Sequence, residues 1–113
     1  MSNLSSMSCT TPGKGDAPLS GSETESYLSQ VPEWRIVEQD NLKRLTREFK
    51  FKNFVEALSF TNKVGDLAEQ EDHHPAILTE WGRVTVTWWT HAVNGLHLND
   101  FITAAKTDEI YTS

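Results

Sequence analysis

Residues 34–71, WRIVEQDNLKRLTREFKFKNFVEALSFTNKVGDLAEQE, contain the two patterns that decide the fold. Trp34 to Glu38 and Leu42 to Phe51 are rich in residues that favour strands, and the second run carries apolar side chains at even spacing. Asp40 and Asn41 lie between the two runs and are typical of a tight turn. The pattern predicts an antiparallel hairpin.

A long helix is predicted directly after this hairpin. Asn53 has a side chain suited to the N-cap, and Glu56 occupies the third helical position. The residues of the expected buried stripe recur at helical spacing: Phe54, Ala57, Leu58, Thr61, Val64 and Ala68. The helix is expected to run close to Glu71, because Pro75 disfavours helical backbone at the residue before it.

Two further strands are predicted from Ile77 to Trp81 and from Arg83 to Ala92, and a last helix begins near Leu98. Alternate side chains of a regular strand point to opposite faces, so His91 is expected to share a face with Thr87. The second pair of strands therefore forms a second hairpin.

The first 20 residues are rich in Ser, Thr, Gly and Pro, which predicts a disordered tail over residues 1–20. Ser22 and Glu25 form a capping-box pattern that opens a short helix through Leu28. Residues 21–113 then form one domain with the order α-β-β-α-β-β-α. This order favours an α+β fold, a four-stranded antiparallel sheet with helices packed on one face. Because such a sheet has open edges, a homodimer or homotetramer is expected.

Composition narrows the class of protein. The chain has 113 residues and a formal net charge of −6, without the excess of Lys and Arg that binding to nucleic acid requires. Its single cysteine, Cys9, has no second cysteine to pair with, so no internal disulfide is expected. The sequence shows neither a secretory leader pattern nor a long apolar run, which predicts a cytoplasmic protein without membrane contact.

Three of the four histidines lie next to expected turns of the sheet. His73 and His74 follow the long helix and precede a proline, and His91 lies near the end of the last strand. One pocket is therefore expected to contain all three imidazoles, with Trp81 or Trp89 as an aromatic wall. Imidazole titrates near neutrality, so such a pocket suits proton transfer to and from a flat heterocycle.

The stretch from Asp72 to Asp100 resembles the pterin-4a-carbinolamine dehydratase family. That family carries a charged residue before His-His-Pro, then an aromatic residue, a Thr-His pair, and an Asp nine residues beyond that His. The matching residues here are Asp72, His73, His74, Pro75, Trp81, Thr90, His91 and Asp100. The likeness covers about Glu25 to Tyr111.

The resemblance implies dehydration of 4a-hydroxytetrahydropterin to quinonoid dihydropterin. This step recycles tetrahydrobiopterin after an aromatic amino acid hydroxylase such as phenylalanine hydroxylase, and the family needs neither a metal nor an organic cofactor. His73, His74 and His91 are then the expected acid and base set. The expected substrate-binding residues are Asp72, Pro75, Trp81, Thr90, Ala92, Val93, Glu69 and Asp100.

Some of these residues have more specific expected roles. Asp72 and Glu69 are suited to orient an imidazole, and by resemblance the backbone of residues 90–93 offers hydrogen-bond partners to the pterin edge. Asp100 also has a simpler explanation, because a carboxylate in the first turn of a helix offsets the helix dipole.

The sequence is also compatible with other functions. The three histidines with Asp72 or Asp100 are acceptable ligands for zinc or a similar ion, although neighbouring histidines seldom both reach one metal. Animal relatives also act as a dimerisation partner of a homeodomain transcription factor, so a protein-binding or coactivator role is an alternative. Some similar proteins occur in cells without an aromatic hydroxylase and are tied to molybdenum-pterin metabolism, a context that the residues do not separate.

Overall fold

The computed structural model describes residues 4–12 and 17–112. Its elements, in chain order, are η1 Leu4–Ser6, α1 Gly21–Leu28, β1 Arg35–Gln39, β2 Leu42–Lys50, α2 Phe54–Glu71, β3 Ala76–Glu80, β4 Arg83–Trp88, η2 His91–Val93 and α3 Leu98–Thr112. Apart from the two short 3-10 helices η1 and η2, this order confirms the predicted α-β-β-α-β-β-α arrangement.

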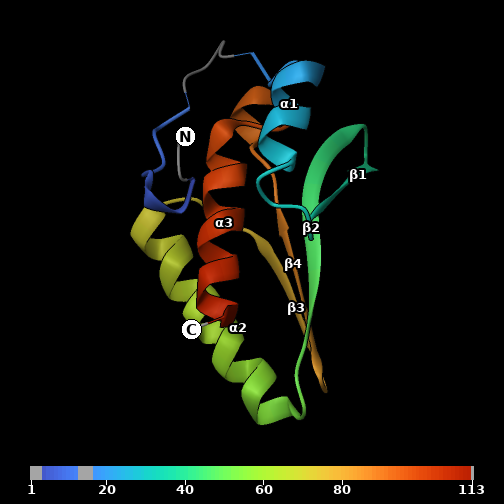
Figure 1. The fold of residues 1–113 in the computed structure, drawn as a ribbon, viewed down its shortest axis with the longest axis vertical. Coiled ribbons are helices and arrows are strands. Elements are labelled where there is room, and N and C mark those ends of the chain that lie inside the picture. The colour runs from blue at the N-terminus through green and yellow to red at the C-terminus, as the bar shows by residue number, and fades with distance from the viewer. Residues whose placement is uncertain (1–3, 13–16, 113) are drawn as a thin grey trace.

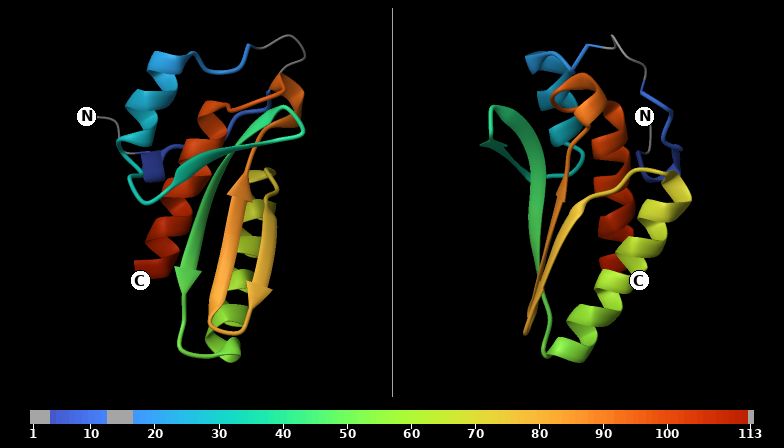
Figure 2. Two further views of the ribbon diagram at one scale, coloured as in Figure 1. Left: turned by 90° about the vertical axis from the view of Figure 1, so that its right-hand side faces the viewer. Right: turned by 180° about the vertical axis from the view of Figure 1, so that it is seen from behind.

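The four strands form one antiparallel sheet in the order β1-β2-β4-β3. Ile36 pairs with Leu45, Phe49 with Val84, and the second hairpin pairs Ala76 with Thr87. The helices pack on one face of this sheet, and Figures 1 and 2 show the other face without a covering helix. The predicted α+β fold is therefore confirmed.

Turn residues fix both hairpins. Asp40 and Asn41 have φ angles of 54° and 63°, the left-handed pair that a two-residue hairpin turn requires. Gly82 has a φ of 75°, and a Cβ at this position would lie 3.1 Å from the carbonyl oxygen of Phe51. Since the amide of Phe51 also donates to the carbonyl of Gly82, this glycine joins the second hairpin to the end of β2.

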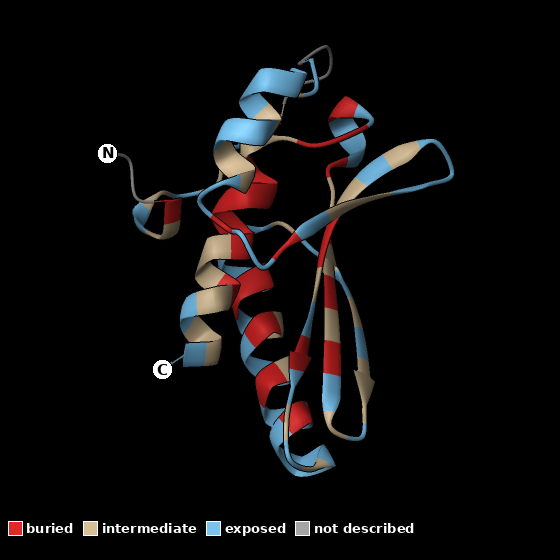
Figure 3. Ribbon diagram, turned by 45° about the vertical axis from the view of Figure 1, so that its right-hand side comes forward, coloured by how far each residue is buried: buried red, intermediate tan, exposed pale blue. Residues whose placement is uncertain are grey.

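The core lies between the inner face of the sheet and the helices α2 and α3 (Figure 3). Its buried residues are mainly Leu45, Phe49, Val84, Val86 and Trp88 of the sheet, Ala57, Phe60, Val64, Leu67 and Ala68 of α2, and Phe101, Ile102 and Ala104 of α3. The predicted stripe of α2 was partly wrong, because Phe54 and Leu58 are 43% and 44% exposed. At about 100° per residue these two side chains lie roughly a quarter turn or more from the stripe that faces the sheet.

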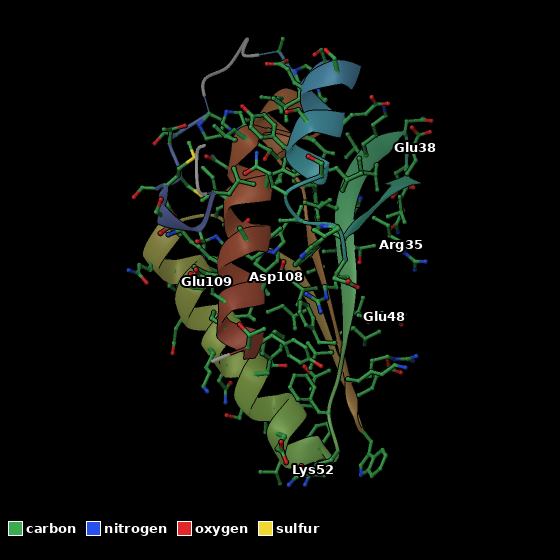
Figure 4. All side chains as sticks on the ribbon, viewed as in Figure 1. Arg35, Glu38, Glu48, Lys52, Asp108 and Glu109 are labelled. Atoms are coloured by element: carbon green, nitrogen blue, oxygen red, sulfur yellow. The ribbon has the colours of Figure 1, made fainter. Side chains whose placement is uncertain are left out.

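A polar contact also joins the two layers. Asp108 of α3 faces the sheet and accepts hydrogen bonds from Trp34 Nε1 at 2.8 Å and from the guanidinium of Arg47 at 2.6 Å. Burial raises the pKa of the Asp108 carboxyl, and these two hydrogen bonds oppose that rise. Figure 4 shows Arg35 and Glu48 extending from the opposite, uncovered face of the sheet.

The capping box of α1 lies two residues before the predicted one. Ser20 is the N-cap, and the amide of Glu23 donates to its hydroxyl while the Glu23 carboxylate accepts from the amide of Ser20. Both Ser-x-x-Glu sequences fit the pattern, so local sequence alone does not choose between them. The backbone bond from the amide of Leu19 to the carbonyl of Leu96 fixes the chain just before Ser20, which favours the earlier start.

Residues 4–12, part of the expected disordered tail, pack against the domain in the structure. Leu4 is buried in the core, and the amide of Cys9 donates to Glu71 Oε1 at 2.8 Å. The backbone of Thr10 exchanges two hydrogen bonds with the Asn99 side chain. A polar composition does not reveal such bonds, since their partners lie more than 60 residues away in the chain. Residues 1–3 and 13–16 of the expected tail lie outside the described residues.

We predict that Cys9 reacts slowly with alkylating reagents. Burial, followed by the nearby Glu71 carboxylate, raises the pKa of the Cys9 thiol from 9.0 to about 12. At pH 8 the reactive thiolate is then about 10³-fold less abundant than in an ordinary thiol. The rate of iodoacetamide labelling measures this, with the same protein unfolded in urea as the control. Equal labelling rates in the folded and unfolded protein would show that Cys9 is not buried, and would support a disordered N-terminal segment.

Candidate functional site

A fully buried carboxylate lies at the centre of the candidate site. Asp100, in the first turn of α3, has no exposed surface. Its Oδ1 lies 2.6 Å from His73 Nε2. Its Oδ2 accepts from the Thr90 hydroxyl at 2.9 Å and from the amide of His97 at 3.0 Å. One side chain therefore joins the exit of α2, the segment after β4 and the start of α3.

The exit of α2 directs His73 inward. Asp72 caps the helix in the left-handed conformation with a φ of 52°, and its amide bonds back to the carbonyls of the last turn. The amide of His73 donates to the carbonyl of Ala68 at 3.1 Å. Asp72, expected to orient an imidazole with its carboxylate, thus supplies the backbone turn that places His73. Aspartate tolerates this conformation better than most residues do.

Two contacts fix the His73 ring. Besides the bond to Asp100, the imidazole stacks on the indole of Trp88 with 5.4 Å between ring centroids and 18° between ring planes. Trp88 is fully buried, and the His73 side chain is only 10% exposed. From the sequence Trp88 was interpreted only as core. Its additional contact with His73 was missed, and the alternation of Val84, Val86 and Trp88 gave no signal for it.

His74 has a different environment from its neighbour. Its Nε2 lies 2.5 Å from Glu69 Oε2, and both side chains are largely exposed. Glu69 lies in the last turn of α2, where its carboxylate contacts His74. Exposed pairs of this kind contribute little to stability.

The position of His91 differs from the predicted one. β4 ends at Trp88 instead of Ala92, and the chain then turns through the 3-10 helix η2, which begins at His91. An isolated bridge between Thr90 and Gly95 replaces the continued strand pairing: β3 begins at Ala76, opposite Thr87, and the pairing of β4 with β2 ends at Trp88 and Leu45. His91 is therefore exposed, and its ring lies edge-on to Trp89 at 5.9 Å between centroids.

Backbone connectivity brings His91 near Asp100, because its neighbour Thr90 donates to that carboxylate. The imidazoles themselves are not linked. Among residues 4–12 and 17–112, no hydrogen bond or ring contact joins the imidazole of His91 to those of His73 and His74. The aromatic ring beside His91 is Trp89, which also lies 4.2 Å from the guanidinium carbon of Arg44.

Trp81 lies away from this end of the sheet within one chain. It occupies the turn between β3 and β4 and is 73% exposed. His74 precedes β3 and Trp81 follows it, so a strand of five residues, roughly 17 Å long, lies between them. Of the two aromatic residues suggested from the sequence, Trp89 is the one at the histidine end.

The remaining predicted residues surround this end of the second hairpin. Pro75 leads into β3, and Ala92 and Val93 lie in η2. The carbonyl of Thr90 already accepts from the amides of Val93 and Gly95. The amides of His91 and Ala92 begin the helical turn, and such amides have no acceptor within the turn.

Neither a metal centre nor a membrane segment is found in the described part of the chain. Within residues 4–12 and 17–112, no group of three or more His, Cys, Asp or Glu side chains is arranged to bind a metal ion. No helix in these same ranges is both long and apolar enough to cross a membrane.

We predict that the two histidine–carboxylate pairs contribute unequally to stability. Asp100→Asn replaces one carboxylate oxygen by an NH2 group, so one of the three donors around the side chain loses its acceptor. This loss should lower the free energy of unfolding by about 2 kcal/mol. Glu69→Gln, the matched change at the exposed pair, should cost less than about 0.5 kcal/mol. Urea denaturation followed by circular dichroism measures both values. Equal losses in the two variants would contradict this difference in burial.

Comparison with known proteins identifies the family. The family model described as pterin 4 alpha carbinolamine dehydratase matches residues 17–110. A candidate pterin-4-alpha-carbinolamine dehydratase of Marinobacter nauticus is 57% identical over 112 residues, which are 98% of this chain and 100% of the relative. A protein with the same description from Nitrosococcus oceani is 57% identical over 97% of each chain.

Solved structures agree with this assignment. The crystal structure of a transcriptional coactivator/pterin dehydratase from Brucella melitensis matches with a TM-score of 0.75 and 35% identity, over 83% of this chain and 98% of that one. A pterin dehydratase-like protein identified as a RuBisCO assembly factor in the alpha-carboxysome shares the fold, with a TM-score of 0.60 and 23% identity. Since the family model and these relatives span most of the chain, the protein belongs to the pterin 4 alpha carbinolamine dehydratase family.

Proposed function

We propose that this protein dehydrates 4a-hydroxytetrahydropterin to quinonoid dihydropterin and water. In this reaction the hydroxyl group on C4a gains a proton and leaves as water, while N5 loses a proton and a C4a–N5 double bond forms. One acid and one base are needed, and no electrons are exchanged with another molecule. Positioned imidazoles supply both proton transfers near neutral pH.

The buried His73–Asp100 pair is the observation that carries the proposal. When Asp100 Oδ1 accepts the proton on His73 Nε2, the neutral ring keeps its lone pair on Nδ1, which can act as a base. The stack on Trp88 prevents the ring from rotating away from this orientation. A histidine oriented by a buried carboxylate is a recurrent arrangement for general base catalysis.

His74 and His91 complete the proposed acid and base set. Both are exposed, so each is able to exchange protons with water between turnovers. We place the flat ring of the pterin near the amides of His91 and Ala92 and beside Pro75. Asp100 and Glu69 orient His73 and His74 in this arrangement and do not touch the pterin.

The physiological context is part of the proposal as well. The expected role is recycling of tetrahydrobiopterin in the cytoplasm for an aromatic amino acid hydroxylase. A phenylalanine hydroxylase gene beside the gene of this protein would support that pathway, whereas molybdenum-pterin genes there would favour the other one.

We predict that dehydration depends on the three histidines. His73→Gln keeps an N–H group for Asp100 but lacks a basic nitrogen, and His74→Ala and His91→Ala change exposed side chains. Loss of a general acid or base should reduce the rate above the spontaneous reaction by about 10²-fold. Stopped-flow absorbance of the pterin measures that rate, and Asn62→Ala on the exposed side of α2 is the control. Full activity in all three folded variants would overturn the site assignment.

Protein binding is the second candidate function, because α2 begins with an exposed apolar surface. Phe54, Val55 and Leu58 are 43%, 75% and 44% exposed. The Brucella melitensis relative is described as a transcriptional coactivator as well as a pterin dehydratase. Exposed apolar side chains clustered on one helix favour contact with another helix or a second copy of the chain.

We predict that Leu58→Glu weakens self-association without changing the dehydration rate, because it places a charge in this apolar surface. Light scattering gives the molecular mass in solution. Gln70→Glu, the same charge at the opposite end of α2, is the control for association. An unchanged mass in Leu58→Glu would count against a role of this surface in self-association.

A further inference from the structure

Residues 4–10, here called the N-terminal strap, lie along α3 and against the end of α2 (Figures 1 and 2). At one end of the strap Leu4 is buried, and the Ser5 hydroxyl donates to Glu109 Oε2 at 2.8 Å. Lys106 Nζ donates to the carbonyl of Ser5 at 3.0 Å. These contacts attach the strap to the middle and the C-terminal half of α3.

At its other end the strap meets Asn99. The amide of Thr10 donates to Asn99 Oδ1 at 3.0 Å, and Asn99 Nδ2 donates to the carbonyl of Thr10 at 2.7 Å. The side chain therefore pairs with a peptide group as a neighbouring strand would. Asn99 is 2% exposed, and the backbone of Thr10 is the hydrogen-bond partner of both polar atoms of its side chain.

A second contact reaches the end of α2. The amide of Cys9 donates to Glu71 Oε1 at 2.8 Å, and Lys106 Nζ lies 3.8 Å from the other oxygen of Glu71. The Glu71 side chain is only 9% exposed, and its partners come from the strap and from α3. A carboxylate this buried depends on its donors. The strap therefore helps to fix where α2 ends.

The two attachment points adjoin the two members of the buried pair. Glu71 lies two residues before His73, and Asn99 is the residue immediately before Asp100. Any displacement of the end of α2 relative to the start of α3 changes the 2.6 Å separation of His73 Nε2 from Asp100 Oδ1. The strap crosses this junction and bonds to both sides of it.

We infer that the N-terminal strap positions His73 against Asp100, acting through Asn99 and Glu71. Asn99 and Glu71 are then positioning residues that do not touch the substrate. The consequence for catalysis rests on the proposed dehydratase function, whereas the consequence for the His73 ring does not.

The test uses three variants of the full chain. Asn99→Ala removes both bonds to Thr10. Thr10→Pro removes the amide donor of an exposed residue, and it also fixes φ at position 10 and restricts Cys9. Because it leaves the sequence of α3 unchanged, it is the alternative variant if Asn99→Ala does not fold. Thr10→Ala keeps the amide donor and is the matched control. Each variant is first checked for cooperative thermal unfolding.

Nitrogen-15 NMR of the imidazoles is the decisive measurement. In the parent protein and in Thr10→Ala, the proton on His73 Nε2 should be shielded from exchange with water by its bond to Asp100. In Asn99→Ala and Thr10→Pro we expect this proton to exchange about tenfold faster or to disappear from the spectrum. A His73 spectrum equal to that of the parent in both folded variants would overturn the inference.

The dehydration assay separates this inference from the proposed function. If both hold, Asn99→Ala and Thr10→Pro should lower kcat about tenfold with little change in KM, because a displaced catalytic group reduces turnover more than binding. If the His73 spectrum changes while the parent protein shows no dehydration above the spontaneous rate, the strap still positions His73 and the proposed function fails.

Discussion

A carboxylate with no exposed surface is tolerated in a protein interior only when donors surround its oxygens, and Asp100 has three of them. The donors come from three segments that are far apart in the chain: His73 after α2, Thr90 after β4, and the amide of His97 before α3. The hydrogen bond from each segment to the buried carboxylate helps to hold that segment in place. The candidate site and the packing of α3 against the sheet therefore depend on the same interaction.

This dependence separates the two neighbouring histidines. His73 has a buried carboxylate on one nitrogen and an indole against its face, so its orientation is set by the fold. His74 has an exposed partner in Glu69 and is itself in contact with water. A fixed imidazole suits the proton transfer that requires accurate geometry, and an exposed one suits exchange with solvent. Two adjacent residues thus have different environments, because the turn at Asp72 directs His73 inward and leaves His74 at the surface.

Local signals in the sequence were sufficient to predict most of the fold. The turn at Asp40 and Asn41 and the N-cap at Asn53 each depend on a few adjacent residues, so the first hairpin and the start of α2 were predicted correctly. The face that α2 buries depends on how the helix rests on the sheet, and there Phe54 and Leu58 were misplaced.

The site was predictable as a set of residues but not as an arrangement. The resemblance selected His73 and Asp100 together, while spacing alone explained Asp100 as a helix-dipole residue. β4 ends at Trp88, where its pairing with β2 also ends, and His91 therefore lies in an exposed 3-10 turn that the residue alternation did not predict. The bonds of Cys9 and Thr10 join residues that are 62 and 89 positions apart in the chain, and no periodicity in the sequence reports contacts of that kind.

The two candidate functions occupy opposite ends of the molecule. The apolar residues Phe54 and Val55 lie where α2 begins, next to the β3–β4 turn, since the amide of Phe51 bonds to Gly82 in that turn. The histidines follow the other end of α2, and 18 helical residues span about 27 Å. A partner bound at the apolar end would leave the histidine end open to a small molecule. Binding of another protein at the apolar end is therefore compatible with the proposed proton transfer at the histidine end.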